Sequence, residues 1–340
     1  MNRWIIIALL VAVGALYFSQ KRTPRNIYRS FYYWKQVPST INETFDSTQL
    51  NALKLKRMYI KFFDIDWRLG DGAYPRESFA RNLDSLTMPI EVVPVVYIMN
   101  HVFQKADSTS LNRLTQKLVE KIGVKYPEIQ LDCDWSGSTR DKYFNWLRQL
   151  RAALPKTVLL SATIRLHQIK DKVKMGVPPV DRGLLMMYNF LNPSDFNERN
   201  SIFEAAEAKK YLKNNAQYPL PLDVALPLFR WGIVYRSHKY FHLFNNLNSK
   251  VADSLLFLTK KGRFYEVNAD TVFRNTYLRY GDKIKIEAIQ DADLMDCARL
   301  AAPLVKKTND LHISYFHYEN DLITTFKPET YEQVFQIFNN

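Results

Sequence analysis

Two aspartates separated by one residue stand where this chain could do acid–base chemistry. Asp132 and Asp134 end the run EIQLDCDW (128–135), in which apolar and polar residues alternate. Side chains two positions apart in a strand lie on the same face, so both carboxyl groups share a face and Cys133 lies on the other. Like-charge repulsion raises the pKa of one member of a close pair, so that one carboxyl group can hold a proton while the other is charged, as acid–base catalysis requires. The segment therefore predicts a catalytic acidic centre at Asp132 and Asp134.

The next strand-like run places an arginine beside these acids. Ser161, Thr163 and Arg165 alternate along TVLLSATIR (157–165) and share one face. Inward-pointing charges are costly to bury unless they are paired or used. We therefore expect Arg165 to bind substrate. The alternative is an Asp–Arg ion pair that only organises this end of the strands.

Further acids close two other strand-like runs. Asp64 and Asp66 close the run RMYIKFFDIDW (57–67), and Glu319 closes LHISYFHYEN (311–320). We expect these acids to face the aspartate pair and to bind substrate, together with Trp67, whose ring could stack on a ligand. For Asp64 and Asp66 the alternative is capping of the glycine-containing loop that follows.

Eight strand-like runs position these residues. The runs are rich in β-branched and aromatic residues, and helical patterns alternate with several of them, as at 111–124, 138–155 and 201–214. This order predicts an α/β fold, a (β/α)8 TIM barrel whose site lies at the C-terminal ends of the strands. The eight runs are 30–36, 57–67, 90–100, 128–135, 157–165, 182–190, 222–231 and 311–320.

The spacing is interrupted once, between the seventh and the eighth run. Residues 232–310 contain two helical and two further β-like patterns. We interpret them as an insertion in a barrel domain that spans 26–340. A competing register counts DKIKIEAI (282–289) as a barrel strand in place of 30–36.

Three strand-end motifs resemble the chitinase-like barrels of glycoside hydrolase family 18. That family carries Asp-x-x-Asp-x-Asp-x-Glu on its fourth strand, Met-x-Tyr-Asp on its sixth and a Pro-x-Tyr-Gly-Arg-like motif after its seventh. This chain has IQLDCDWS (129–136), MMYN (186–189) and PLFRW (227–231) on the matching runs, in the same order. It is also similar to a group of exported bacterial barrels related to those hydrolases. The resemblance implies a TIM barrel that acts on a glycan, with Tyr188 in the catalytic centre and Asn189, Arg230 and Trp231 binding substrate.

The chain departs from the family at the catalytic acid. In the family the motif's glutamate protonates the glycosidic oxygen, and the aspartate before it steers the acetamido group of the substrate. Asp132 and Asp134 match the last two aspartates, but Ser136 stands at the glutamate position, and a hydroxyl group is no general acid near neutral pH. Two functions remain open. The chain is either a glycosidase that uses Asp132 and Asp134 on a cell-envelope or extracellular glycan, or a glycan-binding barrel without catalysis.

The N-terminal segment MNRWIIIALLVAVGALYFSQKR contains an uninterrupted apolar run from Trp4 to Phe18. The run is short for a spanning helix, which needs ~20 residues, and is typical of a signal anchor. We expect residues 1–25 to attach the protein to a membrane, uncleaved, with the barrel on the periplasmic or cell-surface side. Cleavage is the alternative, and Lys21 and Arg22 after the run favour the opposite orientation.

Composition and net charge restrict the classes of partner and cofactor that the protein can bind. The net charge of +13 favours an anionic partner, but no nucleic-acid-binding motif accompanies it and the basic residues are scattered, so we do not expect nucleic acid. Cys133 and Cys297 have no CxxC spacing, and the six histidines form no ligand motif. We therefore expect no metal and no cofactor, and the sequence contains no signal for an oligomeric state.

Overall fold

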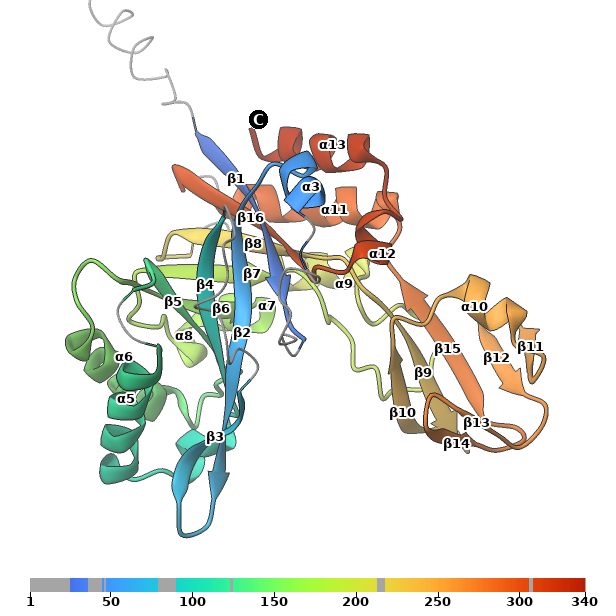
Figure 1. Cartoon of the computed structure of the whole chain (residues 1–340), viewed down its shortest axis with the longest axis horizontal. Coiled ribbons are helices and arrows are strands. Elements are labelled where there is room, and N and C mark those ends of the chain that lie inside the picture. Colours follow the sequence, from blue (N-terminus) through green and yellow to red (C-terminus); the bar gives the residue numbers. More distant parts are fainter. Residues whose placement is uncertain are drawn as a thin grey trace, which may run out of the picture.

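The computed structural model describes residues 25–35, 45, 47–78, 90–122, 125–212, 218–305 and 308–339. Its centre is a closed barrel of eight parallel strands (Figure 1). All eight predicted runs form these strands, so the predicted (β/α)8 barrel is confirmed. In order around the barrel the strands are β1 (Asn26–Tyr33), β2 (Leu55–Arg68), β4 (Glu91–Ile98), β5 (Glu128–Asp132), β6 (Leu159–Arg165), β7 (Arg182–Met186), β8 (Leu222–Pro227) and β16 (Asp310–Phe316).

Because the strands are parallel, all of them begin at one end of the barrel, here called the base, and end at the other, here called the mouth. Helices cover the outside and return the chain to the base. They are α3 (Ser47–Ala52), α4 (His101–Lys105), α5 (Ser108–Ile122), α6 (Arg140–Ala153), α7 (Leu166–Lys170), α8 (Lys172–Met175), α9 (Ala205–Leu212), α11 (Asp291–Ala301), α12 (Asn320–Ile323) and α13 (Pro328–Asn339).

The outward faces of the strands supply the core beneath these helices. Trp135 is buried against Tyr143 and Phe144 of α6, and its indole nitrogen donates a hydrogen bond to Met175 O at 2.8 Å. Cys133 is buried on the same side. These contacts confirm the predicted alternation along β5, with the aspartates directed inward.

A second sheet is formed by the segment between β8 and β16 in the sequence, which are the seventh and eighth barrel strands. This sheet extends to the right of the barrel in Figure 1. It forms the predicted insertion. The run DKIKIEAI forms its strand β15 (Lys283–Ala288), so the competing register is wrong. The sheet has the order β10 (Lys239–Asn245), β9 (Arg230–Arg236), β15, β12 (Phe264–Val267) and β11 (Leu258–Lys261), accompanied by α10 (Ser249–Ser254) and the hairpin β13 (Thr271–Phe273) and β14 (Thr276–Leu278).

Two details bear on the barrel ends. Helix α11, which follows the inserted sheet, packs on β8 and α13 and so belongs to the helical layer of the barrel. Beyond the mouth, β2 continues into an antiparallel hairpin with β3 (Gly72–Ser78).

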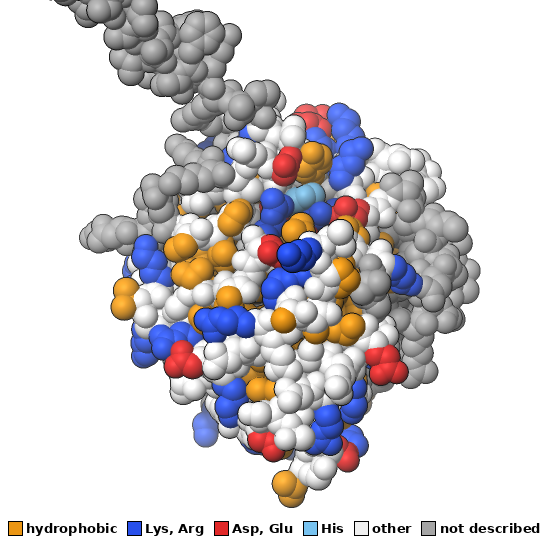
Figure 2. Space-filling view, turned by 90° about the vertical axis from the view of Figure 1, so that its left-hand side faces the viewer, with side chains coloured by type: hydrophobic (Ala, Val, Ile, Leu, Met, Phe, Trp, Pro, Cys, Tyr) orange, Lys and Arg blue, Asp and Glu red, His pale blue; other side chains and the backbone are white. Residues whose placement is uncertain are grey.

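In the described part of the chain, no helix is both long and apolar enough to cross a membrane. The predicted anchor falls on residues 1–24, outside the described residues, and on Arg25. On the face shown in Figure 2, Lys and Arg side chains are spread among acidic and hydrophobic ones.

Candidate functional site

Parallel pairing of β5 with β6 brings two acids beside two partners at the mouth. Gln130 pairs with Ser161 in register, so the next inward positions place Asp132 beside Thr163. Asp132 is 3% exposed and accepts a hydrogen bond from Thr163 Oγ1 at 2.7 Å. Asp134 lies nearer the open end, with a side chain 46% exposed.

Arg165 forms a two-point ion pair with Asp134. Its Nε donates to Asp134 Oδ1 at 2.7 Å, and its Nη2 donates to Oδ2 at 3.2 Å. Burial alone would lower the pKa of the Arg165 guanidinium, but the carboxylates of Asp134 and Asp132 outweigh burial and raise it. Arg165 is therefore a permanent cation over the buried acid.

The buried carboxyl group is the one with the altered acidity. Burial raises the pKa of Asp132 from its usual 3.8 to about 6. The Arg165 cation opposes this rise, and the carboxylate of Asp134 adds to it. A group with a pKa near 6 holds a proton in part of the molecules at mildly acidic pH, which is what general acid–base catalysis requires.

A buried lysine that the sequence reasoning missed completes this charge cluster. Lys61 of β2 pairs with Asp64, 2.8 Å from Nζ to Oδ1, and both side chains are buried. Its ammonium lies 5.0 Å from the centre of the Trp34 ring and lowers the pKa of Asp132. Asp64 is thereby connected to the site through Lys61. The available signal was a lysine at an inward position of an otherwise apolar run.

Aromatic rings line the mouth around the acids. Phe316, the last residue of β16, lies with its ring centre 5.1 Å from that of Tyr188, 5.7 Å from Phe229 and 5.8 Å from Trp34. Phe316 was also missed, although it is an aromatic residue closing a predicted strand. Burial raises the pKa of Tyr97 to about 12, and Asp132 and Asp134 add to that rise.

Tyr188 adds a polar group to these rings. It follows β7 and is buried, and within the described residues its hydroxyl has no hydrogen-bond partner. Burial raises the pKa of this hydroxyl; the Arg165 cation opposes the rise, and Asp132 and Asp134 add to it. A buried hydroxyl without a partner costs about 1–3 kcal/mol, so it is an unfilled donor beside the acidic centre.

Ser136 is occupied within its own loop. Its hydroxyl is 2.9 Å from Ser138 Oγ and 3.2 Å from Thr139 Oγ1, and its carbonyl accepts the amide of Arg140 at 2.9 Å. Thr139 Oγ1 in turn donates to Asn100 Oδ1 at 2.6 Å. The residue at the family's glutamate position therefore helps to begin α6 and contributes no acid.

Two predicted residues at the end of β2 form a separate group. Asp66 Oδ1 is 2.7 Å from His101 Nε2 and 2.7 Å from the amide of Trp67. Burial would raise the pKa of Asp66, but the Trp67 amide and His101 outweigh it and lower the pKa. Trp67 is half-buried against the core.

The other predicted residues have partners around the rim. Glu319 forms an ion pair with Lys35, and its Oε2 lies 3.6 Å from His317 Nε2. Arg230 donates to Asn246 Oδ1 and to Asp321 Oδ2, both at 2.5 Å.

Two more predicted residues lie near the sixth and seventh strand ends. Trp231 donates from its indole to Glu287 Oε2 at 2.7 Å. Asn189 is exposed beside Tyr188 and has φ 59°, a left-handed conformation that asparagine tolerates better than most residues.

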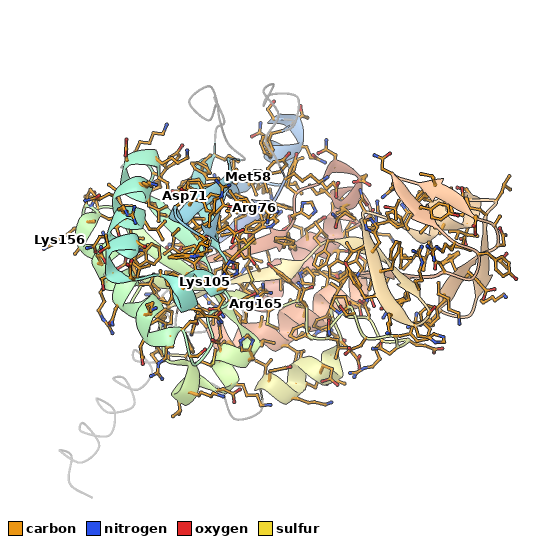
Figure 3. The ribbon with its side chains drawn as sticks, turned by 90° about the horizontal axis from the view of Figure 1, so that it is seen from below. Met58, Asp71, Arg76, Lys105, Lys156 and Arg165 are labelled. Atoms are coloured by element: carbon orange, nitrogen blue, oxygen red, sulfur yellow. The ribbon has the colours of Figure 1, made fainter. Side chains whose placement is uncertain are left out.

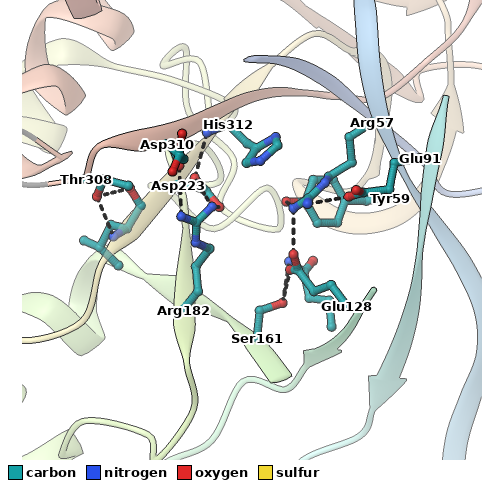
Figure 4. A network of polar contacts seen from close by, with 12 residues as sticks. Arg57, Tyr59, Glu91, Glu128, Ser161, Arg182, Asp223, Thr308, Asp310 and His312 are labelled. Carbon is teal, nitrogen blue, oxygen red and sulfur yellow. Dashed lines mark hydrogen bonds and ion pairs between the residues drawn. The ribbon is translucent and has the colours of Figure 1, made fainter. Parts of the chain in front are cut away.

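Figure 3 labels Arg165, the last residue of β6, and Lys105, the last residue of α4, near the centre of the view, whereas Lys156, which precedes β6, lies at the far left. The base has a polar cluster of its own (Figure 4). Arg57 donates to Glu128 at 2.6 Å, and Arg182 Nη1 lies 3.0 Å from Asp223 Oδ2. This second cluster is buried beneath the barrel and closes it, so we assign it a structural role.

No protein-family model matches the sequence, and no curated protein matches it. Similar solved structures show the fold. The spore cortex-lytic enzyme SleL of Bacillus cereus is 16% identical, with a TM-score of 0.56 over 94% of this chain and 76% of that chain. SleL of Bacillus megaterium is 12% identical, with a TM-score of 0.58 over 94% and 75%. A chitinase from Bacteroides thetaiotaomicron is 12% identical, with a TM-score of 0.57 over 93% and 97%. The predicted resemblance to chitinase-like barrels is thus confirmed for the fold.

Proposed function

We propose that this barrel binds a cell-envelope or extracellular glycan at its mouth and hydrolyses a glycosidic bond, with Asp132 and Asp134 as the acidic centre. One observation carries the proposal. A buried carboxyl group with its pKa raised to about 6 lies one inward position below a half-exposed carboxylate, in a mouth lined by aromatic rings. Rings beside polar side chains suit a sugar, which has apolar C–H faces and hydroxyl edges.

The residues then have distinct roles. Asp132 supplies the proton that the leaving oxygen must receive. A water molecule adds to the anomeric carbon as the bond to the leaving oxygen breaks, and Asp134, held in its charged form by Arg165, takes up the proton that the water loses. Transfer of that proton from Asp134 to Asp132 restores the starting state. Arg165 orients Asp134, and the Tyr188 hydroxyl donates a hydrogen bond to the sugar at the cleavage point.

The similar folds support a glycan as the substrate class. Among proteins with this fold are enzymes named as chitinases and as spore cortex-lytic enzymes. Fold likeness alone does not transfer activity, so the chemistry of the mouth carries the proposal and the fold supports it.

A second candidate is a glycan-binding barrel without turnover. It is favoured by the loop contacts of Ser136 and by the two-point pairing of Asp134 with Arg165, which stabilises the carboxylate over the acid. Binding would still use the aromatic mouth and Tyr188.

We further propose that the N-terminal segment anchors the protein, with the barrel on the extracytoplasmic side. The apolar run from Trp4 to Phe18 and the basic residues after it support an anchor. A glycan substrate of the cell envelope supports the location.

The test is a panel of chitin oligosaccharides, peptidoglycan and neutral glycans incubated with the full chain. We expect released product with wild type and its loss in Asp134→Asn and Asp132→Asn, with folding checked by circular dichroism. Saturable binding without product in wild type would establish the second candidate. Neither binding nor product with any glycan would overturn the proposal.

A further inference from the structure

The chain enters the barrel at the base and is fixed there immediately. Arg25, the residue before β1, donates from Nε to Thr308 O at 2.7 Å and from Nη1 to Phe338 O at 3.2 Å, and a third hydrogen bond goes to Val305 O. The amide of Asn26 then donates to Asn309 O at 2.9 Å. The described chain therefore begins at the base of the barrel.

The candidate site lies at the opposite end. Asp134, Arg165 and Tyr188 follow or close strands whose first residues are at the base. A strand rises ~3.3 Å per residue, so β6, with 7 residues, separates base from mouth by roughly 20 Å. In Figure 1 the strand starts of β1, β8 and β16 lie on the left, and the inserted sheet lies on the right beyond the end of β8.

The base exposes basic side chains, and three of the acids there have partners. Glu91 pairs with Arg57, Asp181 with Arg151 at 3.0 Å, and Asp310 accepts from Asn26 at 2.8 Å. On the left-hand face, turned to the viewer in Figure 2, Lys and Arg side chains are intermixed with acidic and hydrophobic ones. The exposed lysines that precede or begin barrel strands at the base are Lys54, Lys56, Lys125 and Lys156.

We infer that the base rests on an anionic membrane surface and that the mouth points away from the bilayer. The apolar run at 4–18 and the basic residues Lys21 and Arg22 precede Arg25 in the sequence. Each lysine near an anionic surface contributes about 1 kcal/mol at most, so the surface orients the barrel while the anchor holds it. The inference rests on the proposed anchor and not on the proposed reaction.

This orientation restricts the substrate. A glycan joined to a lipid headgroup begins at the bilayer surface, below the base. A polymer that extends from the membrane reaches the mouth. We therefore assign an extended envelope polymer, rather than a short lipid-linked saccharide, as the ligand of the mouth.

The test uses the full chain in vesicles of phosphatidylcholine with phosphatidylglycerol. Cys133 and Cys297 are buried, so an added cysteine takes a fluorescent label selectively. Lys156→Cys reports on the base and Lys105→Cys on the mouth, and a headgroup-attached nitroxide lipid quenches nearby labels. We expect several-fold stronger quenching at the base. Equal or reversed quenching in chains that resist alkaline extraction would overturn the orientation, and chains released by alkali would overturn the anchor; neither result affects the glycan assay.

A second experiment tests whether the lysines at the base help to orient the barrel on the anionic surface. Lys54→Glu, Lys56→Glu and Lys125→Glu, combined in the chain labelled at position 156, should weaken quenching in the anionic vesicles and leave it unchanged in phosphatidylcholine alone. Lys170→Glu in the same labelled chain, on α7 after the mouth, is the matched control and should change neither. Unchanged quenching in the triple variant would show that these lysines only complement the C-terminal ends of the helices, and it would overturn the anionic surface.

Discussion

Arg165 binds both oxygens of Asp134, at 2.7 Å and 3.2 Å, and its charge also acts on Asp132 one inward position below. The exposed carboxylate thus has a fixed cation, while the buried one is the group with the raised pKa. The two acids therefore differ in protonation: Asp134 is held in its charged form, and Asp132 carries a proton near pH 6.

Arg165→Gln should raise the pKa of Asp132 above about 6, because the guanidinium opposes the effect of burial. The measurement is a carbon-13 titration of the labelled aspartate carboxyl groups. Arg165→Lys keeps the positive charge and should leave the value near that of wild type. An unchanged pKa in Arg165→Gln would show that the ion pair does not reach Asp132.

Asp132→Asn should remove the contribution of this carboxyl group to the pH dependence of the free energy of unfolding. The folded pKa, about 6, lies above the usual 3.8, so the folded protein binds the proton first as the pH falls. Wild type therefore gains stability between about pH 7 and pH 4, by roughly 3 kcal/mol at most. The asparagine variant, which can still accept from Thr163, lacks this gain.

Urea unfolding of both proteins at several pH values measures the difference. Burial lowers the pKa of His312 to about 3 and that of His317 to about 4; those histidines reduce stability in acid, but equally in both proteins. Asp223→Asn at the base is the matched comparison, because burial raises the pKa of Asp223 to about 7. A pH-independent difference between wild type and Asp132→Asn would contradict the assignment.

Tyr188→Phe should weaken glycan binding about tenfold, the loss of one hydrogen bond, without loss of stability. Its hydroxyl has no partner among the described residues, so its removal leaves no protein group unpaired. Tyr32→Phe is the control, because the Tyr32 hydroxyl donates to Gln130; it should cost about 1–2 kcal/mol of stability. Calorimetric binding and thermal unfolding of the two variants separate the roles, and a Tyr188→Phe protein that binds normally would exclude this tyrosine from the site.

The barrel could be predicted from the sequence because each strand is a local run. β-branched and aromatic residues mark the eight predicted runs, and alternation along β5 and β6 places Asp134 and Arg165 on the same side. These features depend on neighbours along the chain.

The rest of the site depends on partners distant in sequence. Lys61 acts on Asp132 from β2, and Phe316 reaches Tyr188 from the last strand. The sequence likewise does not show which predicted residues form ion pairs, because the partners lie far apart in the chain. Arg230, for example, binds Asp321, 91 residues later. The role of Ser136 depends on the hydrogen bonds of its hydroxyl group with Ser138 and Thr139, which its residue type alone does not specify.

The base cluster should matter for folding and not for the ligand. Arg57→Met leaves the buried Glu128 with Ser161 as its remaining partner in the cluster, which should cost about 3–5 kcal/mol. Arg299→Met is the control, since Arg299 and Asp296 form an exposed pair worth at most about 1 kcal/mol. Chemical denaturation measures both, and equal effects of the two variants would refute a structural base cluster.

A buried ion pair within β15 of the inserted sheet is connected to the segment that follows β7 by a hydrogen bond to each of its members. Lys285 and Glu287 of β15 lie 2.8 Å apart, both almost fully buried, and Glu287 accepts from Trp231 and Ser201. Glu287→Gln keeps an acceptor for Trp231 but leaves the Lys285 charge unpaired, so it should cost about 3–5 kcal/mol. Adding Lys285→Met removes the orphan charge and should restore much of the loss, since burying no charge avoids its desolvation. Denaturation of the single and double variants decides the point: a double variant as unstable as Glu287→Gln would mean that the hydrogen bonds to Trp231 and Ser201, rather than the charge pair, hold the sheet in place.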